Sequence, residues 1–179
     1  MKLRYKIRSI WEELKLKCRV LWAAAKSPWM GDITPVGRLH AVVVRSDGSQ
    51  EALGLISTKV VTDAGVAFLV DAMQGITEPE VLRFHASGTG TTAEAASQTA
   101  LVTEVGSRVS GTLAEGASAN IFRTVATINY TSTLAITEHG IFSASTGGTL
   151  LDRSVFAAIN VINGDSIQFT YELTFPAGS

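Results

Sequence analysis

The C-terminal end of the chain carries the clearest alternation of apolar and polar positions. Every second residue is large and apolar at Ile167, Phe169, Tyr171, Leu173 and Phe175, and the residues between them are Gln, Thr and Glu. Successive side chains of a strand point to opposite faces, so this spacing predicts a half-buried strand. The apolar run over residues 150–161 is the expected partner strand. Asn163-Gly164-Asp165 is the expected turn between the two.

Weaker patterns upstream predict further strands. Residues 39–45 and 51–61 read as a hairpin around Ser46-Asp47-Gly48, and residues 81–85 as a strand leading into a Gly-Thr loop. The Ala-rich residues 92–99 are expected at the surface, with a helical turn or two as an alternative. Later strands are expected near residues 108–113, 119–130 and 134–143. Seven or eight short strands separated by Gly, Ser and Thr predict a mainly β protein, an antiparallel β sandwich with jelly-roll-like topology.

One short internal helix interrupts the strands. Thr62-Asp63 is typical of a helix N-terminus, and Gly75 follows the expected last turn, which ends near Met73. The spacing of Val66, Leu69, Val70 and Met73 places them on one face of this helix. We expect that face to be the inner one.

The first residues show a helical period instead. Apolar side chains recur every three or four positions over residues 2–26, and Ser27-Pro28 ends the pattern. We therefore divide the chain into an amphipathic helical arm (1–28), a linker (29–36) and a β-sandwich body (37–179). Three interpretations of the arm remain open: packing on its own domain, binding a partner protein, or lying on a membrane surface. A partner is favoured, and the residues expected to bind it are Ile7, Trp11, Leu14, Leu21, Trp22 and Trp29.

Charge supports the division between arm and body. The chain has 179 residues and a formal net charge of −1. Eight Lys and Arg against two Glu in residues 1–26 give 8 − 2 = +6, which leaves −1 − 6 = −7 for the remainder. Such asymmetry is typical of a basic arm on an acidic body. The apolar run in the arm is too short for a secretory signal, and no stretch is long enough to span a bilayer.

Short motifs that could carry chemistry lack the partners they need. Gly88-Thr89-Gly90-Thr91-Thr92 resembles a phosphate loop, but no lysine follows Gly90 anywhere in the chain. Gly164-Asp165-Ser166 resembles a hydrolase nucleophile block, but it lies in the final turn and has no identifiable histidine partner. The single cysteine, Cys18, excludes an internal disulfide and a multi-cysteine metal site. We expect a protein that is not an enzyme and has no cofactor.

Two further kinds of site are conceivable, a metal site at the histidines and a nucleic-acid site on the basic arm, and the sequence favours neither. His40, His85 and His139 are scattered without paired spacing, which argues against a metal site. His139, beside Glu138, is expected to be packed or at the surface, with a pH-sensitive contact as the alternative. The basic residues of the arm are interleaved with Trp11 and Trp22, as in some nucleic-acid binders. Because these tryptophans follow the apolar stripe and the remainder is acidic, nucleic-acid binding is disfavoured.

Two blocks of sequence resemble a family of small structural proteins of tailed bacteriophages. They are HASGTGTTAEAASQTALVTEV (85–105) and ITEHGIFSASTGGTLLDRSVFAAINVINGDSIQFTYELTF (136–175). The shared pattern is a Gly-Thr-Gly loop (88–90), Thr-Ala-Leu followed by an acid (99–104), and a Glu-x-Gly-Ile-Phe strand (138–142). A Gly-Gly-x-Leu-Leu-x-Arg hairpin (147–153) and a final hairpin with Gly-Asp-Ser (164–166) follow. The resemblance covers roughly the C-terminal half and not the arm.

This resemblance implies a virion structural protein, assembled in the host cytoplasm. The favoured form is a capsid decoration or cement protein that binds the shell through its arm and stabilises it. Its implied partners are the major capsid protein or other virion proteins, and a homo-oligomer, provisionally a trimer, is expected. The alternative is a tail, neck or fibre component whose β domain binds a receptor or glycan.

Overall fold

The computed structural model describes residues 35–58 and 60–176 of the chain. The described residues 35–58 and 60–175 belong to one compact unit, which we call the body. The predicted arm, nearly all of the predicted linker and the six predicted partner-binding residues lie outside the described residues. The first strand begins at Val36, the last residue of the predicted linker.

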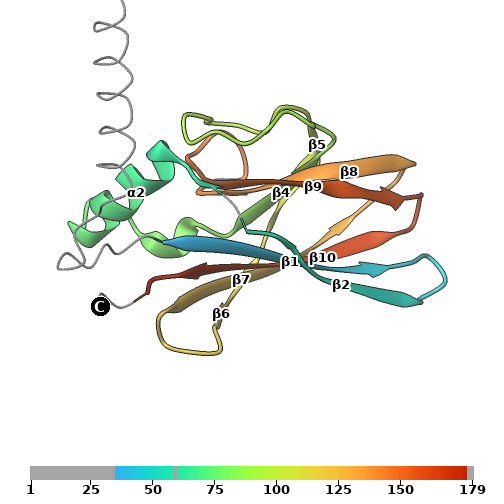
Figure 1. Cartoon of the computed structure of the whole chain (residues 1–179), viewed down its shortest axis with the longest axis horizontal. Helices are drawn as coiled ribbons and strands as arrows, with labels where there is room; N and C mark the ends of the chain where they lie inside the picture. The colour runs from blue at the N-terminus through green and yellow to red at the C-terminus, as the bar shows by residue number, and fades with distance from the viewer. Residues whose placement is uncertain (1–34, 59, 177–179) are drawn as a thin grey trace, which may run out of the picture. The chain divides into compact units, whose positions relative to one another are not determined.

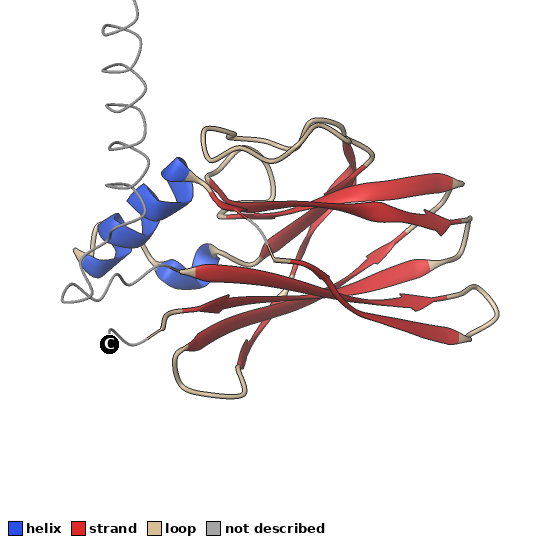
Figure 2. Ribbon diagram, viewed as in Figure 1, coloured by secondary structure: helices blue, strands red, loops and turns tan. Residues whose placement is uncertain are grey.

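The described part of the body is mainly β, as the sequence predicted, and all strand pairs in it are antiparallel. One five-stranded sheet has the order β2-β1-β10-β7-β6 and the other β3-β9-β8-β4-β5, so ten strands replace the expected seven or eight. The two sheets lie face to face, with the helix at one end (Figures 1 and 2). The elements are β1 (Val36–Val44), β2 (Gln50–Ser57), β3 (Val60–Val61), α2 (Asp63–Met73), the 3-10 turn η1 (Pro79–Val81), β4 (Phe84–Gly88), β5 (Glu104–Ser110), β6 (Thr112–Glu115), β7 (Ile121–Asn129), β8 (Leu134–Phe142), β9 (Leu150–Val161) and β10 (Ser166–Thr174).

The core lies between the sheets and follows the predicted alternation. Ile167, Phe169, Tyr171 and Leu173 of β10 are each at most 1% exposed, and the residues between them are half-buried or exposed. β1 and β7, the neighbours of β10, alternate in the same way, and β8 and β9 contribute the opposite wall of the same core. Burying a large apolar side chain contributes roughly 1.5–3 kcal/mol, so this shared layer is what joins the sheets.

The predicted pairing of the last two strands is wrong. β10 lies between β1 and β7, whereas β9 pairs with β8 and β3 in the other sheet. The turn at Asn163-Gly164-Asp165 therefore carries the chain across the sandwich. The Asp165 carboxylate explains this course, because it accepts hydrogen bonds from the Ser46 backbone N–H at 2.9 Å and from Arg45 at 3.1 Å. These contacts attach the turn to the β1–β2 connection, which belongs to the sheet that β10 enters.

Helix α2 has the predicted ends, but of the four residues predicted on its inner face only Leu69 packs against the core. The Thr62 hydroxyl accepts a hydrogen bond from the Gly65 N–H at 2.9 Å, and Gly75 adopts a positive φ just beyond the helix. A Cβ on Gly65 would lie 2.5 Å from the Leu151 carbonyl oxygen, so this glycine lets the helix approach β9 closely. That approach turns partly buried Phe68 and Leu69 toward the core. Exposed outer positions are Val66 at 46%, Val70 at 41% and Met73 at 80%.

Two other segments differ from their predicted form. The strand expected over 51–61 stops at Ser57, and Val60–Val61 pairs with β9 in the other sheet. Within 81–85 the chain first completes η1, and β4 then runs from Phe84 to Gly88. Residues 92–99 are exposed or half-buried, as predicted, and contain no helix. A hydrophobic period cannot show such changes of sheet, because both sheets share one core.

Candidate functional site

Parts of the two sequence blocks behind the phage resemblance meet on the outer face of the sheet β3-β9-β8-β4-β5. Glu138 lies in the middle of β8, and Gly140, two residues further on, pairs with Arg153 of β9. Glu138 and Arg153 are therefore diagonal neighbours on one face, where side chains of this length can touch. The connection between β4 and β5, which we call the 89–103 loop, covers them. A second small apolar cluster supports the same face and consists of Ala86, Leu101, Phe142 and Leu150.

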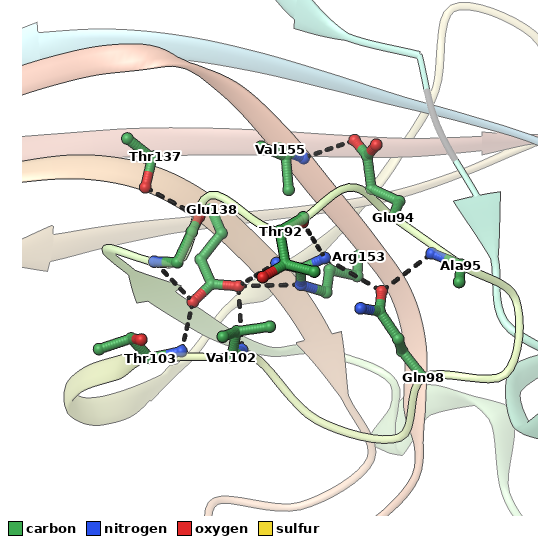
Figure 3. Close-up of polar contacts among 11 residues, drawn as sticks. Thr92, Glu94, Ala95, Gln98, Val102, Thr103, Thr137, Glu138, Arg153 and Val155 are labelled. Atoms are coloured by element: carbon green, nitrogen blue, oxygen red, sulfur yellow. Dashed lines mark hydrogen bonds and ion pairs between the residues drawn. The ribbon is translucent and has the colours of Figure 1, made fainter.

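Glu138 and Arg153 form a fully buried ion pair. The carboxylate Oε2 of Glu138 lies 2.8 Å from Arg153 Nε and 2.7 Å from Nη2, and the two side chains are 0% and 1% exposed. The same carboxylate accepts hydrogen bonds from the backbone N–H groups of Gly90 at 3.0 Å, Thr103 at 2.7 Å and Val102 at 3.1 Å (Figure 3). Burial alone would raise the pKa of Glu138, but the hydrogen bonds from Thr103, Arg153 and Val102 and the positive charge of Arg153 outweigh burial and hold the pKa below its usual value.

The guanidinium of Arg153 fixes the other end of the loop. Its Nη1 donates to the Thr92 carbonyl and to the Gln98 side-chain oxygen, both at 3.0 Å. Glu94 accepts a hydrogen bond from the Val155 N–H at 2.7 Å (Figure 3). The ion pair and Glu94 therefore attach both halves of the loop to β8 and β9. The network therefore holds the 89–103 loop in place. The charged atoms of Glu138 and Arg153 are already in contact with each other and with the loop.

A glycine is required where the loop passes the carboxylate. A Cβ on Gly90 would lie 2.5 Å from Glu138 Oε1, so any side chain there would displace the acceptor. The Gly-Thr-Gly segment singled out in the sequence is thus a close approach of backbone to a buried carboxylate. Its Gly90 N–H donates to Glu138, and Thr137 donates to the Gly90 carbonyl at 2.9 Å.

A second polar cluster lies inside the sandwich. His85 Nδ1 is 3.0 Å from His139 Nε2, and His85 Nε2 is 3.1 Å from the Thr124 hydroxyl. The His139 ring packs on Phe169 with 4.5 Å between ring centroids. Burial lowers the pKa of His85 to about 3 and also lowers that of His139, where His85 adds to the effect. His139 is therefore packed, and it contacts His85 rather than its sequence neighbour Glu138.

Asp152 is the centre of a third buried polar cluster. Its carboxylate accepts hydrogen bonds from the Tyr171 hydroxyl at 3.2 Å and the Ser154 hydroxyl at 3.3 Å. Burial raises the pKa of Asp152 to about 7. The carboxyl is thus partly protonated near neutral pH in the folded protein, whereas in the unfolded chain it ionises near pH 4, as free aspartate does.

Replacing Asp152 with asparagine is expected to change the pH dependence of stability. The folded protein binds more protons than the unfolded chain between about pH 4 and pH 7, so wild-type stability falls across that window as pH rises. Asparagine cannot ionise, and the variant should gain about 1.4 kcal/mol relative to wild type per pH unit over the window. Urea unfolding at pH 5 and pH 8 measures the difference. The exposed change Asp71→Asn is the control, and an Asp152→Asn effect equal at both pH values would contradict the prediction.

Sequence reasoning missed these buried polar groups as a set. The sequence did contain a sign of them, because Glu138, Asp152 and Arg153 are charged residues inside otherwise apolar strands. Among the described residues no cluster of three or more His, Cys, Asp or Glu side chains could hold a metal ion. The helices within the same residues are all too short or too polar to cross a membrane. No family model, curated protein or solved structure matches the chain.

Proposed function

We propose that this chain is a virion structural protein of a tailed bacteriophage, a capsid decoration or cement protein. One observation supports the proposal. The Gly-Thr-Gly loop, the Glu-x-Gly-Ile-Phe strand and the Leu-Leu-x-Arg hairpin, which carry the resemblance, meet at the Glu138–Arg153 ion pair. If these segments together hold one surface loop in place, that shared task explains why they occur together in the family pattern. The proposed role of the body is to present that loop on the particle.

The proposal includes the partners and the topology. The N-terminal arm binds the shell, with the major capsid protein or another virion protein as its partner, and the protein forms a homo-oligomer, provisionally a trimer. No catalysis, cofactor or nucleic acid is involved. The pairing of β1 with β10 and of β3 with β9 places early strands beside the last ones, which supports a jelly-roll-like topology.

A tail, neck or fibre role is the second candidate, and one depression favours it. A hollow of about 370 Å³ opens between β5 and the β7–β8 turn. Ser107, Asn129, Thr131 and Ser132 contribute polar groups to its lining, and the half-buried Val105, Val109 and Leu134 contribute apolar surface. Hydroxyl and amide groups around such a hollow suit the hydroxyl groups of a glycan. Separating the heads and tails of purified particles and detecting the protein with an antibody decides between the two roles.

The arm provides the sharpest test of particle binding. The double change Trp11→Ala and Trp22→Ala is expected to abolish most binding to undecorated particles, because large aromatic side chains in desolvated pockets each contribute ~2 kcal/mol or more. Lys2→Ala with Lys6→Ala should change little at physiological salt, where exposed charges are screened. Co-sedimentation with particles measures both variants. Full occupancy by the double tryptophan variant would place the anchor in the body.

A further inference from the structure

Helix α2 carries an exposed apolar row that its own domain does not cover. Val66, Val70 and Met73 occupy positions i, i+4 and i+7, so they lie on one face, which we call the outer stripe. Ile76, 68% exposed, follows just beyond the helix. Single exposed apolar residues are ordinary, but a contiguous row marks an interaction surface.

The outer stripe continues into an apolar groove. This groove encloses about 280 Å³, and Met73 belongs both to it and to the stripe. Such a volume is just below the range of roughly 300–1,000 Å³ typical of small-molecule sites and suits one or two large side chains. The lining comes from α2, from the η1 region and from the ends of β7 and β10, and consists of Leu69, Ala72, Met73, Pro79, Leu82, Phe122, Leu173 and Phe175.

Acidic residues border this surface. Asp63, Asp71, Glu78 and Glu80 are all exposed, and the single basic residue between positions 60 and 83 is the half-buried Arg83. We call these four carboxylates the acidic rim. On the strand side of the groove, Arg123 is paired with Glu172 at 2.9 Å. A complementary partner therefore presents large apolar side chains flanked by basic ones.

We propose that the α2 face, meaning the outer stripe, the groove and the acidic rim, binds residues 1–28 of a second copy of this chain. That segment carries the required chemistry, with eight basic residues against two acidic ones and tryptophans at positions 11 and 22. A helix over residues 2–26, as the sequence predicts, would be about 37 Å long, whereas the 11 residues of α2 span about 16 Å. One α2 face thus covers less than half of the arm, and the remainder is free to contact the shell. The contact between copies does not require the virion role.

Self-association of the full-length protein tests the proposal. Sedimentation velocity from about 1 to 100 µM spans the affinities expected of a contact of this size. Met73→Lys places a cation against the basic arm and is expected to weaken self-association at least tenfold. Ile162→Lys is the matched control, since Ile162 is 53% exposed and lies in the β9–β10 turn. Equal dimerisation by these two variants, or a wild-type protein monomeric at the highest concentration, would overturn the proposal.

A charge exchange distinguishes a second copy from the same chain. Asp71→Lys with Glu78→Lys reverses half of the acidic rim, and Lys15→Glu with Lys17→Glu reverses part of the arm. Each double variant alone is expected to associate at least tenfold more weakly than wild type. An equimolar mixture should recover association, because the basic arm of the first then meets the acidic rim of the second. A mixture that associates no better than either variant alone would show that the arm and the acidic rim do not pair between copies, which also overturns the proposal.

Discussion

Replacing Glu138 with alanine is expected to lower the free energy of unfolding by about 3–5 kcal/mol, as for other buried ion pairs that lose one partner. The change leaves the Arg153 guanidinium, 1% exposed, without its counter-ion. It also removes the acceptor of three backbone N–H groups of the 89–103 loop. Urea unfolding at pH 7 measures the loss. Glu51→Ala is the matched control, because its pair with Arg45 is exposed and should contribute no more than about 1 kcal/mol.

The same variant should release the loop locally. Hydrogen exchange of residues 89–103 should accelerate well beyond that of β10, which the network does not touch. Replacing both charges, Glu138→Leu with Arg153→Met, removes the unpaired cation but restores no acceptor for the loop. We therefore expect the double variant to regain only part of the lost stability. Full recovery with a protected loop would show that the ion pair does not hold the loop.

Acid should destabilise the fold through the two interior histidines. The pKa of His85 is about 3 in the folded protein and that of His139 is also lowered, whereas in the unfolded chain both should protonate near pH 6.5. Because the unfolded chain then binds more protons, stability falls as pH drops below about 6.5, by about 1.4 kcal/mol per unit for each histidine. Asp152 acts in the opposite direction between about pH 4 and pH 7. A net fall of about 1.4 kcal/mol per pH unit should remain.

The double variant His85→Gln and His139→Gln isolates this contribution. Glutamine does not titrate, so the variant should be less stable than wild type at pH 7 but should lose the fall between pH 6.5 and pH 4. Urea unfolding at half-unit intervals of pH gives the slope for each protein. An unchanged slope in the double variant would assign the acid sensitivity to other groups.

The elements of this fold could be predicted from local pattern, but the pairing of its last strands could not. The alternation from Ile167 to Leu173 fixed which side chains of β10 are buried. It gave no information on which strands pair with β10, since β9 buries Leu151, Ile159 and Val161 in the same core from the opposite sheet. The contact that decides the course, Asp165 with the backbone of Ser46, joins residues 119 positions apart.

The prediction of which residues of α2 face inward was mostly wrong, for a different reason. Both sides of this helix are apolar, so the period alone allowed either of them to face inward. The missing clue was Gly65, whose lack of a side chain brings the helix against Leu151. The buried polar contacts were not predicted for a similar reason, because Glu138 and Arg153 become neighbours only once β8 and β9 are paired. The arm lies outside the described residues, and its predicted role stays a prediction.

Because β1 and β10 are neighbours, the positions at which an added peptide could be attached differ in what lies around them. Val36 pairs with Thr174, so the body begins and ends at one pole, which α2 shares (Figure 1). The β1–β2 turn at Asp47-Gly48 lies at the other pole. A peptide fused after β10 would therefore crowd the groove, whose lining includes Leu173 and Phe175. The same peptide grafted between Asp47 and Gly48 would be displayed at the far end of the sandwich, away from the groove and from Val36.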